Sequence, residues 1–190
     1  MGTPNFAIPI LQSIKESNHN ILSVYTQTPQ KKNRGQKMGL TPIHEFSKRN
    51  NLKVRHPENL DTDEELEFFR KEKPDIVVVV AYGKILPRSL LNIDNIKFIN
   101  VHASLLPKWR GAAPIQRSIM NLDKETGISI MKIEEQLDTG PVCNSYKINI
   151  ENNLNVEDVS EKLSSLAAEK ILDNIEDIYE DNANFVEQDH

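Results

Sequence analysis

The chain has 190 residues, of which 38% are hydrophobic, and it carries a formal net charge of −5 and a single cysteine, Cys143. This length suits one domain with one core, and the apolar content is too high for a disordered chain. The longest apolar run, residues 76–81, is far shorter than the roughly 20 residues that cross a bilayer. With no targeting segment and no cysteine pair, we expect a cytoplasmic protein, or one of an equivalent organellar matrix, without a membrane contact.

The charged residues are sorted along the chain. Eight basic residues and one acid lie between Lys31 and Arg55, whereas twelve acids and two lysines lie between Glu151 and the end. An acidic protein can therefore carry a local basic patch, so the overall charge does not exclude a nucleic-acid partner.

Local signals in the first third of the chain predict two helices, a strand and a loop. Apolar residues at helical spacing predict a helix over residues 5–18, and the run at 21–26 predicts a strand. Residues 27–40 are polar and basic and contain two glycines, which predicts a long exposed loop. Thr41–Pro42 supplies an N-cap and a first helical residue for a helix to about Lys48.

The rest of the chain alternates strands with helices. Thr62, with Glu65 three residues later, forms a capping-box pattern for another helix, and the β-branched run after it indicates a strand covered on both faces. Further strands are expected at 98–102, 127–133 and 142–150, and further helices at 112–122 and 156–179. This alternation predicts an α/β fold with a doubly wound, mostly parallel sheet in one domain.

Three polar residues stand out as candidate catalytic groups. Asn100 and His102 end the strand predicted at 98–102 and point to the same side of it, and Asp138 stands in a second strand-loop setting. Amide and imidazole N–H groups can stabilise an oxygen that becomes negative in a tetrahedral intermediate, by about 2.7–4 kcal/mol per donor. A nearby carboxylate can order a water and assist proton transfer. This set suits acyl transfer to an amine that is itself the nucleophile.

Spacing alone leaves structural roles open for the same residues. An Asn and a His at a strand end are often turn formers or satisfied core polar groups, and Asp138 before Thr139–Gly140 can be a turn residue. Other site types are absent from the sequence, which contains no GxxxxGKS/T, GxGxxG, HExxH, CxxC or GxSxG pattern. The five histidines are scattered, and we expect no metal site.

Longer motifs resemble a known family, the formyltransferase superfamily that uses 10-formyltetrahydrofolate. They are GTPNFAIPIL, RGQKMGLTPI, VVVVAYGKILP, NVHASLLPKWRGAAPIQRSI and ETGISIMKIEEQLDTGPV, which together extend over most of the chain. The resemblance is nearest to the branch whose acceptor is initiator methionyl-tRNA. It implies a Rossmann-like fold in which Asn100 and His102 stabilise the oxyanion on the formyl carbon, while Asp138 orders water and assists proton transfer from the attacking amine.

The resemblance also assigns the substrate-binding segments. It implies that the loop from Ser104 to Gly111 borders the acceptor side. The residues counted with the folate pocket are Gly83, Lys84, Ile85, Leu86, Ser104, Leu105, Leu106, Pro107, Gln136 and Leu137. Those expected to contact the tRNA are Lys31, Lys32, Arg34, Lys37 and Arg110.

Two alternatives stay beside this interpretation. The chain could be a formyltransferase for a small amine, such as a sugar or purine precursor, or an inactive folate- or RNA-binding fragment. A solvated basic loop without a ligand would leave the first alternative open, whereas phosphate contacts from Lys31 to Lys37 favour tRNA.

Relatives of this kind begin with an apolar strand before the GTP motif and continue into a C-terminal β-barrel domain. We expect residues 1–190 to form the catalytic domain without these two parts, through a start-site error, a gene fragment or deliberate shortening. Oligomeric state stays open, with a monomer as the default.

Overall fold

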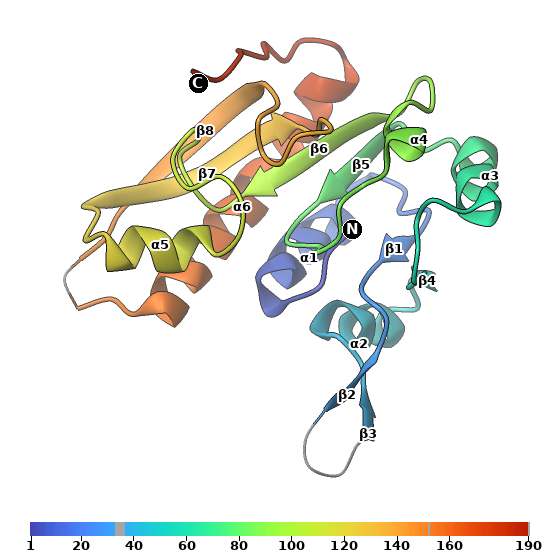
Figure 1. The fold of residues 1–190 in the computed structure, drawn as a ribbon, viewed down its shortest axis with the longest axis horizontal. Coiled ribbons are helices and arrows are strands. Elements are labelled where there is room, and N and C mark those ends of the chain that lie inside the picture. Colours follow the sequence, from blue (N-terminus) through green and yellow to red (C-terminus); the bar gives the residue numbers. More distant parts are fainter. Residues whose placement is uncertain (33–36, 152, 190) are drawn as a thin grey trace.

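The computed structural model describes residues 1–32, 37–151 and 153–189. Helices and strands alternate through most of the chain, and none of the described helices is long and apolar enough to cross a membrane (Figure 1). In chain order the elements are η1 (Asn5–Ala7), α1 (Ile8–Glu16), β1 (Val24–Tyr25), β2 (Gln30–Lys32), β3 (Lys37–Gly39), α2 (Pro42–Arg49), β4 (Val54–Arg55), α3 (Asp63–Glu72), β5 (Ile76–Val79), α4 (Arg88–Leu91), β6 (Lys97–His102), α5 (Pro114–Met120), β7 (Glu125–Lys132), β8 (Val142–Asn149) and α6 (Val156–Tyr179).

The main sheet has four strands in the order β5-β6-β7-β8. β5 and β6 run parallel, whereas β7 and β8 join in antiparallel pairs, and β1 and β4 form a separate parallel pair. The predicted α/β class with a Rossmann-like arrangement is confirmed. The strand expected at 21–26 is shorter than predicted, since only Val24 and Tyr25 are paired as β1.

Both faces of the sheet are covered. Val78 on β5 and Val80 just after it contact one cluster of apolar side chains, whereas Val77 and Val79 belong to the other. α1 and α6 contribute to the first cluster, and residues of α3 and α4 contribute to the second. The expectation that this strand is covered on both sides is therefore confirmed.

The prediction of a loop over residues 27–40 is wrong for residues 30–32 and 37–39. β2 and β3 form an antiparallel ladder from Gln30 opposite Gly39 to Lys32 opposite Lys37, and Figure 1 shows this hairpin extending away from the rest of the fold. Strands are predicted from alternating hydrophobic side chains, and this polar segment has no such alternation. Its ladder is made by backbone groups, which leave no pattern in the sequence. Residues 33–36 lie outside the described part of the chain.

Both predicted N-caps are formed, but the Glu65 side chain does not complete the capping box predicted at Thr62. The Thr41 hydroxyl accepts a hydrogen bond from His44 N at 3.1 Å, as expected for the start of α2. The Thr62 hydroxyl likewise accepts from Glu65 N at 3.3 Å, which caps α3. The Glu65 carboxylate is engaged elsewhere. It accepts from the Tyr25 hydroxyl at 2.6 Å and from Arg55 Nη2 at 2.5 Å, which ties α3 to β1 and β4.

Residues 1–2 connect the β1–β4 pair with the main sheet. Gly2 N donates to Tyr25 O at 2.9 Å, and Val80 N donates to Met1 O at 2.8 Å, so that Gly2 and Val80 form a parallel bridge. The α-amine of Met1 donates to Val78 O at 2.7 Å, and burial lowers its pKa to about 5.

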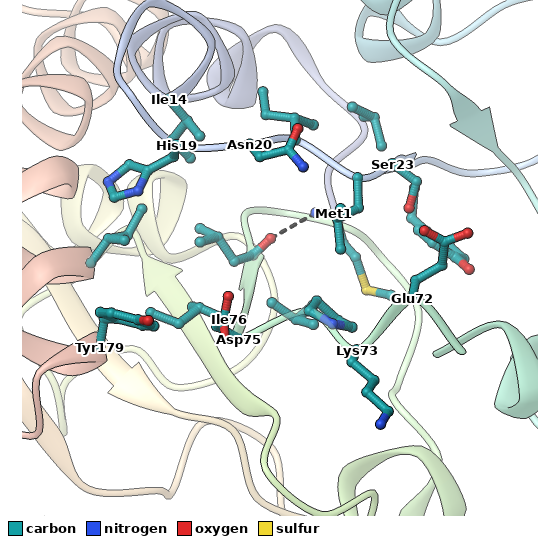
Figure 2. A pocket seen from close by; sticks show the side chains of 18 of the residues that line it. Met1, Ile14, His19, Asn20, Ser23, Glu72, Lys73, Asp75, Ile76 and Tyr179 are labelled. Carbon is teal, nitrogen blue, oxygen red and sulfur yellow. Dashed lines mark hydrogen bonds between the residues drawn. The ribbon is translucent and has the colours of Figure 1, made fainter. Parts of the chain in front are cut away.

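A pocket of about 520 Å³ opens beyond Met1, between the facing edges of β1 and β5. Figure 2 shows Met1 within it, hydrogen-bonded to a carbonyl, with Ser23 and Ile76 at its sides. Because backbone groups alternate along a strand, the N–H and C=O of Ile76 face the same side as the Val78 carbonyl that Met1 contacts. The pocket therefore offers a hydrogen-bonding edge to an extended segment.

Glu65→Ala is predicted to lower the free energy of unfolding by about 3 kcal/mol, because it leaves the Arg55 guanidinium and the Tyr25 hydroxyl without their acceptor in a site where the Glu65 side chain is 6% exposed. Urea denaturation measures the change. Glu64 also pairs with Arg55, but its side chain is 84% exposed, so Glu64→Ala is the matched control and costs less than about 1 kcal/mol. Equal losses in the two variants would contradict the role given to Glu65.

About four apolar residues fused before Met1 are predicted to fill the pocket as a strand, since each strand residue spans about 3.3 Å. Burying two of their side chains would raise the free energy of unfolding by roughly 3 kcal/mol or more in a urea titration. A Gly-Ser extension of the same length is the control. An equal gain from that control would show that strand pairing is not the cause.

Candidate active site

The end of β6 places Asn100 and His102 on one side of the main sheet. Asn100 lies opposite Met131 and His102 lies opposite Ser129, both on β7. The side chain of His102 is 7% exposed, whereas Asn100 is half-buried. Two residues of spacing in a strand bring both side chains to the same face, as the sequence predicts.

Asp138 reaches these two side chains from the turn between β7 and β8. Its Oδ1 accepts a hydrogen bond from Asn100 Nδ2 at 3.1 Å, and its Oδ2 lies 3.5 Å from His102 Nδ1. Oδ2 also accepts from Gly111 N at 2.9 Å. The structure thus brings together the three candidate catalytic residues, and it adds a backbone N–H that the sequence did not indicate.

Both ring nitrogens of His102 face acceptors. Nε2 lies 3.0 Å from Trp109 O, and a carbonyl oxygen can only accept, so Nε2 carries a proton in this arrangement. Nδ1 faces the Asp138 carboxylate. The Trp109 carbonyl therefore fixes the orientation of the ring.

The pair of N–H donors and one carboxylate defines what the site can do chemically. Asn100 Nδ2 has two hydrogens, and the bond to Asp138 uses one of them, which leaves the other for a ligand oxygen. The Nε2 proton of His102 is donated to Trp109 O in this structure, so it becomes a second donor to a ligand only where the ligand oxygen displaces that carbonyl. Together with a carboxylate that can accept a proton, these groups suit attack of an amine on a carbonyl carbon.

Loop 104–111 takes its shape from contacts with β7 and with the segment after α5. The Ser104 side chain is fully buried and its hydroxyl donates to Lys108 O at 2.5 Å, while Ser129 Oγ donates to Ser104 O at 2.8 Å. Trp109 Nε1 donates to Asp123 Oδ2 at 2.7 Å. Hydrogen bonds from Asn121 first, and then from Trp109, lower the pKa of Asp123, so the acceptor stays ionised.

Trp109 lies at the surface, between the side chains of Arg117 and Asp123. Its half-buried ring lies under the guanidinium of Arg117, 4.9 Å from the ring centroid, and its indole is held by Asp123. These contacts fix the position of the carbonyl that binds His102.

The segment from Gly83 to Leu86 lies beside a hollow of about 540 Å³ that Gly83 and Lys84 line together with residues 27–30 and Glu58. Gly83 has a φ of +79°, a conformation that glycine adopts without strain. Lys84 Nζ donates to Pro57 O at 2.6 Å and to Glu58 O at 2.9 Å, so its charge is already engaged. The pocket beyond Met1 contains none of the candidate catalytic side chains.

An ion pair between Arg88 and Glu135, at 2.7 Å, links α4 to the loop that carries Gln136 and Leu137. The segment before α4 and this loop therefore lie near each other. Ile85 is 78% exposed and Leu137 is 62% exposed, so both apolar side chains are available to a ligand.

The other residues predicted for the folate pocket differ in accessibility. Leu86 and Ser104 are buried, so a ligand could meet only their backbone groups. Leu105 and Leu106 are half-buried, whereas Pro107 and Gln136 are exposed.

The predicted tRNA contacts are only partly within the described structure. Lys31, Lys32 and Lys37 stand on β2 and β3, but their side chains lie outside the described part, and so does the whole of Arg34. Arg110 binds the C-terminal segment of the chain instead of facing solvent alone. Its Nε donates to Gln188 Oε1 at 2.9 Å and its Nη2 donates to Asp189 O at 3.3 Å.

Sequence reasoning missed Gln188, whose side-chain amide donates to Asp138 O at 3.0 Å and to Gly140 O at 2.7 Å. It stands in a polar segment after α6 with no motif around it. No local signal could have singled it out.

Comparison with characterised proteins gives long matches. A curated relative named methionyl-tRNA formyltransferase, from Pelagibacter ubique (strain HTCC1062), is 57% identical over 190 residues, which is all of this chain and 61% of the relative. Relatives of the same name from Wolbachia sp. subsp. Drosophila simulans (strain wRi) and Clostridioides difficile (strain 630) are 45% and 40% identical, over 93% and 100% of the chain and 60% and 62% of their own length. The chain spans about three fifths of the length of these relatives.

Solved structures share the fold at lower identity. A phosphoribosylglycinamide formyltransferase from Bacillus halodurans has a TM-score of 0.72 at 23% identity, over 94% of this chain and 95% of that one. The N-formyltransferase from Helicobacter canadensis, solved with folinic acid and dTDP-3-aminofucose, has a TM-score of 0.73 at 20% identity, over 100% of this chain and 66% of that one. In the sequence itself, residues 1–175 match the family described as formyl transferase, and the chain belongs to that family.

Proposed function

We propose that residues 1–190 are the catalytic domain of an enzyme that transfers a formyl group from 10-formyltetrahydrofolate to the α-amine of methionine on initiator methionyl-tRNA. The observation that carries the proposal is the Asp138 carboxylate, which faces an amide, an imidazole and a backbone N–H. The names of the curated relatives support the choice of acceptor.

The chemical steps follow from these groups. The methionine amine attacks the formyl carbon and a new C–N bond forms, while the carbonyl oxygen becomes an oxyanion. The free N–H of Asn100 stabilises this oxyanion, and the Nε2–H of His102 adds a second hydrogen bond by exchanging the Trp109 carbonyl for the oxyanion. Asp138 accepts the proton that the amine loses, directly or through a water. The bond from the formyl carbon to N10 of the donor then breaks, and N10 takes up a proton.

The substrate sides follow from the flanking segments. Exposed Ile85 and Leu137 offer apolar contact to the flat ring of the donor, and the ion pair between Arg88 and Glu135 lies where their segments approach each other. The basic residues of the β2–β3 hairpin would contact tRNA phosphates. We further propose a monomer that needs no metal and acts in the cytoplasm, or in an equivalent organellar matrix.

A formyl-transfer assay separates this function from its alternatives. It compares the chain alone, and the chain fused to the C-terminal part of the Pelagibacter ubique relative, on charged initiator tRNA and on amino sugars. Transfer to tRNA supports the proposal. Transfer to the small amines alone, or folate binding without any transfer by either protein, would replace it with one of the alternatives.

Asp138→Ala is predicted to lower kcat by roughly 10²–10⁴-fold, because it removes the proton acceptor and frees both Asn100 and His102. Binding of the folate donor, measured by fluorescence titration or calorimetry, should change little. Glu134→Ala is the control, since Glu134 is an exposed acid of the same loop. Near-normal turnover of the Asp138 variant would remove Asp138 from the mechanism.

Neutralising the four basic residues of the hairpin is predicted to weaken tRNA binding and to flatten its dependence on salt, by about 0.7–0.9 in the log–log slope for each phosphate that the protein no longer neutralises. The variant replaces Lys31, Lys32, Arg34 and Lys37 by Gln. Its charge-matched control replaces four exposed basic residues elsewhere, namely Lys15, Arg70, Lys71 and Lys147. An unchanged salt slope in the hairpin variant, or an equal weakening in the control, would exclude the hairpin from the tRNA site.

A further inference from the structure

We infer that Gln188 is a positioning residue that holds the Asp138 turn against the loop of Arg110 and thereby sets the place of the Asp138 carboxylate. The inference deepens the function proposed above and rests on it for its kinetic consequence. The structural part of the inference, that the Gln188 side chain places the Asp138 turn, can be tested by a measurement that does not require enzymatic activity.

The Gln188 side chain uses both of its amide hydrogens and one lone pair of its oxygen to bind the two loops of the site. Nε2 donates to Asp138 O at 3.0 Å and to Gly140 O at 2.7 Å, while Oε1 accepts from Arg110 Nε at 2.9 Å. Two carbonyl acceptors on one side and a guanidinium donor on the other fix which end of the amide is nitrogen. Gln188 is 8% exposed, so water does not readily replace these bonds.

Backbone pairing brings Gln188 to this place. Val186 and Val142 form an antiparallel bridge at the start of β8, with both N–H···O distances at 2.9 Å. Arg110 Nη2 donates to Asp189 O at 3.3 Å on the other side of Gln188. The segment after α6 is thus fixed before and after Gln188, and Figure 1 shows it returning to the β8 side of the sheet.

The Asp138 turn needs such support. Asp138 has a φ of +53°, in the left-handed region that is unfavourable for most residues with a side chain. The peptide carbonyls of Asp138 and Gly140 are the groups that Gln188 satisfies, on the backbone that directs the carboxylate. Loss of these two hydrogen bonds therefore allows the turn to move at Asp138, the residue that accepts the proton in the proposed mechanism.

The hydrogen bonds also form a closed ring. Gly111 N, next to Arg110, donates to the Asp138 carboxylate, and the Arg110 side chain returns through Gln188 to the Asp138 backbone. Trp109, the residue before Arg110, orients His102 through its carbonyl. Gln188 thus couples the placement of Asp138 to that of the loop that orients the imidazole.

Two substitutions separate the donor and acceptor halves of this side chain. Gln188→Glu keeps the shape and the acceptor for Arg110, but it turns a carboxylate oxygen toward the two carbonyl oxygens. Gln188→Ala removes both halves. Glu187→Gln is the matched control, since Glu187 is exposed on the same segment.

The first measurement is hydrogen exchange by NMR. The Gly111 amide, which donates to Asp138, should exchange at least about ten-fold faster in Q188E and Q188A than in the unsubstituted chain. The amide of Ile130, inside β7, should keep its rate in all proteins, and E187Q should behave as the unsubstituted chain. Unchanged Gly111 exchange in both Gln188 variants would overturn the inference, and so would an equal acceleration at Ile130, which reports general loosening.

The second measurement is the formyl-transfer assay on charged tRNA. Because a displacement of about 1 Å can cost up to roughly 10²-fold in rate, kcat should fall at least ten-fold in Q188E and Q188A while both KM values stay within about two-fold. A rise in KM without loss of kcat would make Gln188 a binding residue and overturn the inference. If the unsubstituted chain transfers no formyl group, either alone or fused to the C-terminal part of the Pelagibacter ubique relative, the proposed function fails, whereas the exchange experiment still decides the positioning role.

Discussion

Groups from two separate segments meet at the carboxylate of Asp138. The strand end supplies Asn100 and His102, and loop 104–111 supplies the Gly111 N–H. A carboxylate that is 11% exposed needs such partners, because a buried charge without hydrogen bonds is costly. The position of the turn, the end of β6 and the course of the loop therefore depend on one another, and the site is defined by this mutual dependence more than by any single element.

Sequence patterns were sufficient to predict the features that depend on residues close together in the chain. The alternation of side chains along a strand placed Asn100 and His102 together, and the hydroxyls of Thr41 and Thr62 cap the helices that were expected after them. The apolar periodicity of residues 156–179 predicted the bounds of α6. Each of these depends on residues at most a few positions apart, which is why a single sequence contains the information.

Contacts between segments that are distant in the chain could not be predicted from such patterns. Glu65 stands where a capping box would use it, yet its carboxylate is drawn to Tyr25 and Arg55, since a buried charge gains more from a guanidinium and a phenol than from a helix end. The β2–β3 ladder has no hydrophobic alternation to reveal it. Gln188 is 50 residues from Asp138 in the chain, so its role exists only once the fold has formed.

The contacts that hold Trp109 in place have a practical consequence. It is the only tryptophan of the chain, its indole donates to the ionised Asp123, and its own carbonyl meets the imidazole of His102. All indole emission of this chain therefore originates from one loop that contacts His102 of the candidate site. A substrate that shifts this loop changes the surroundings of the fluorophore directly, which gives the chain an intrinsic optical probe of site occupancy that needs no label.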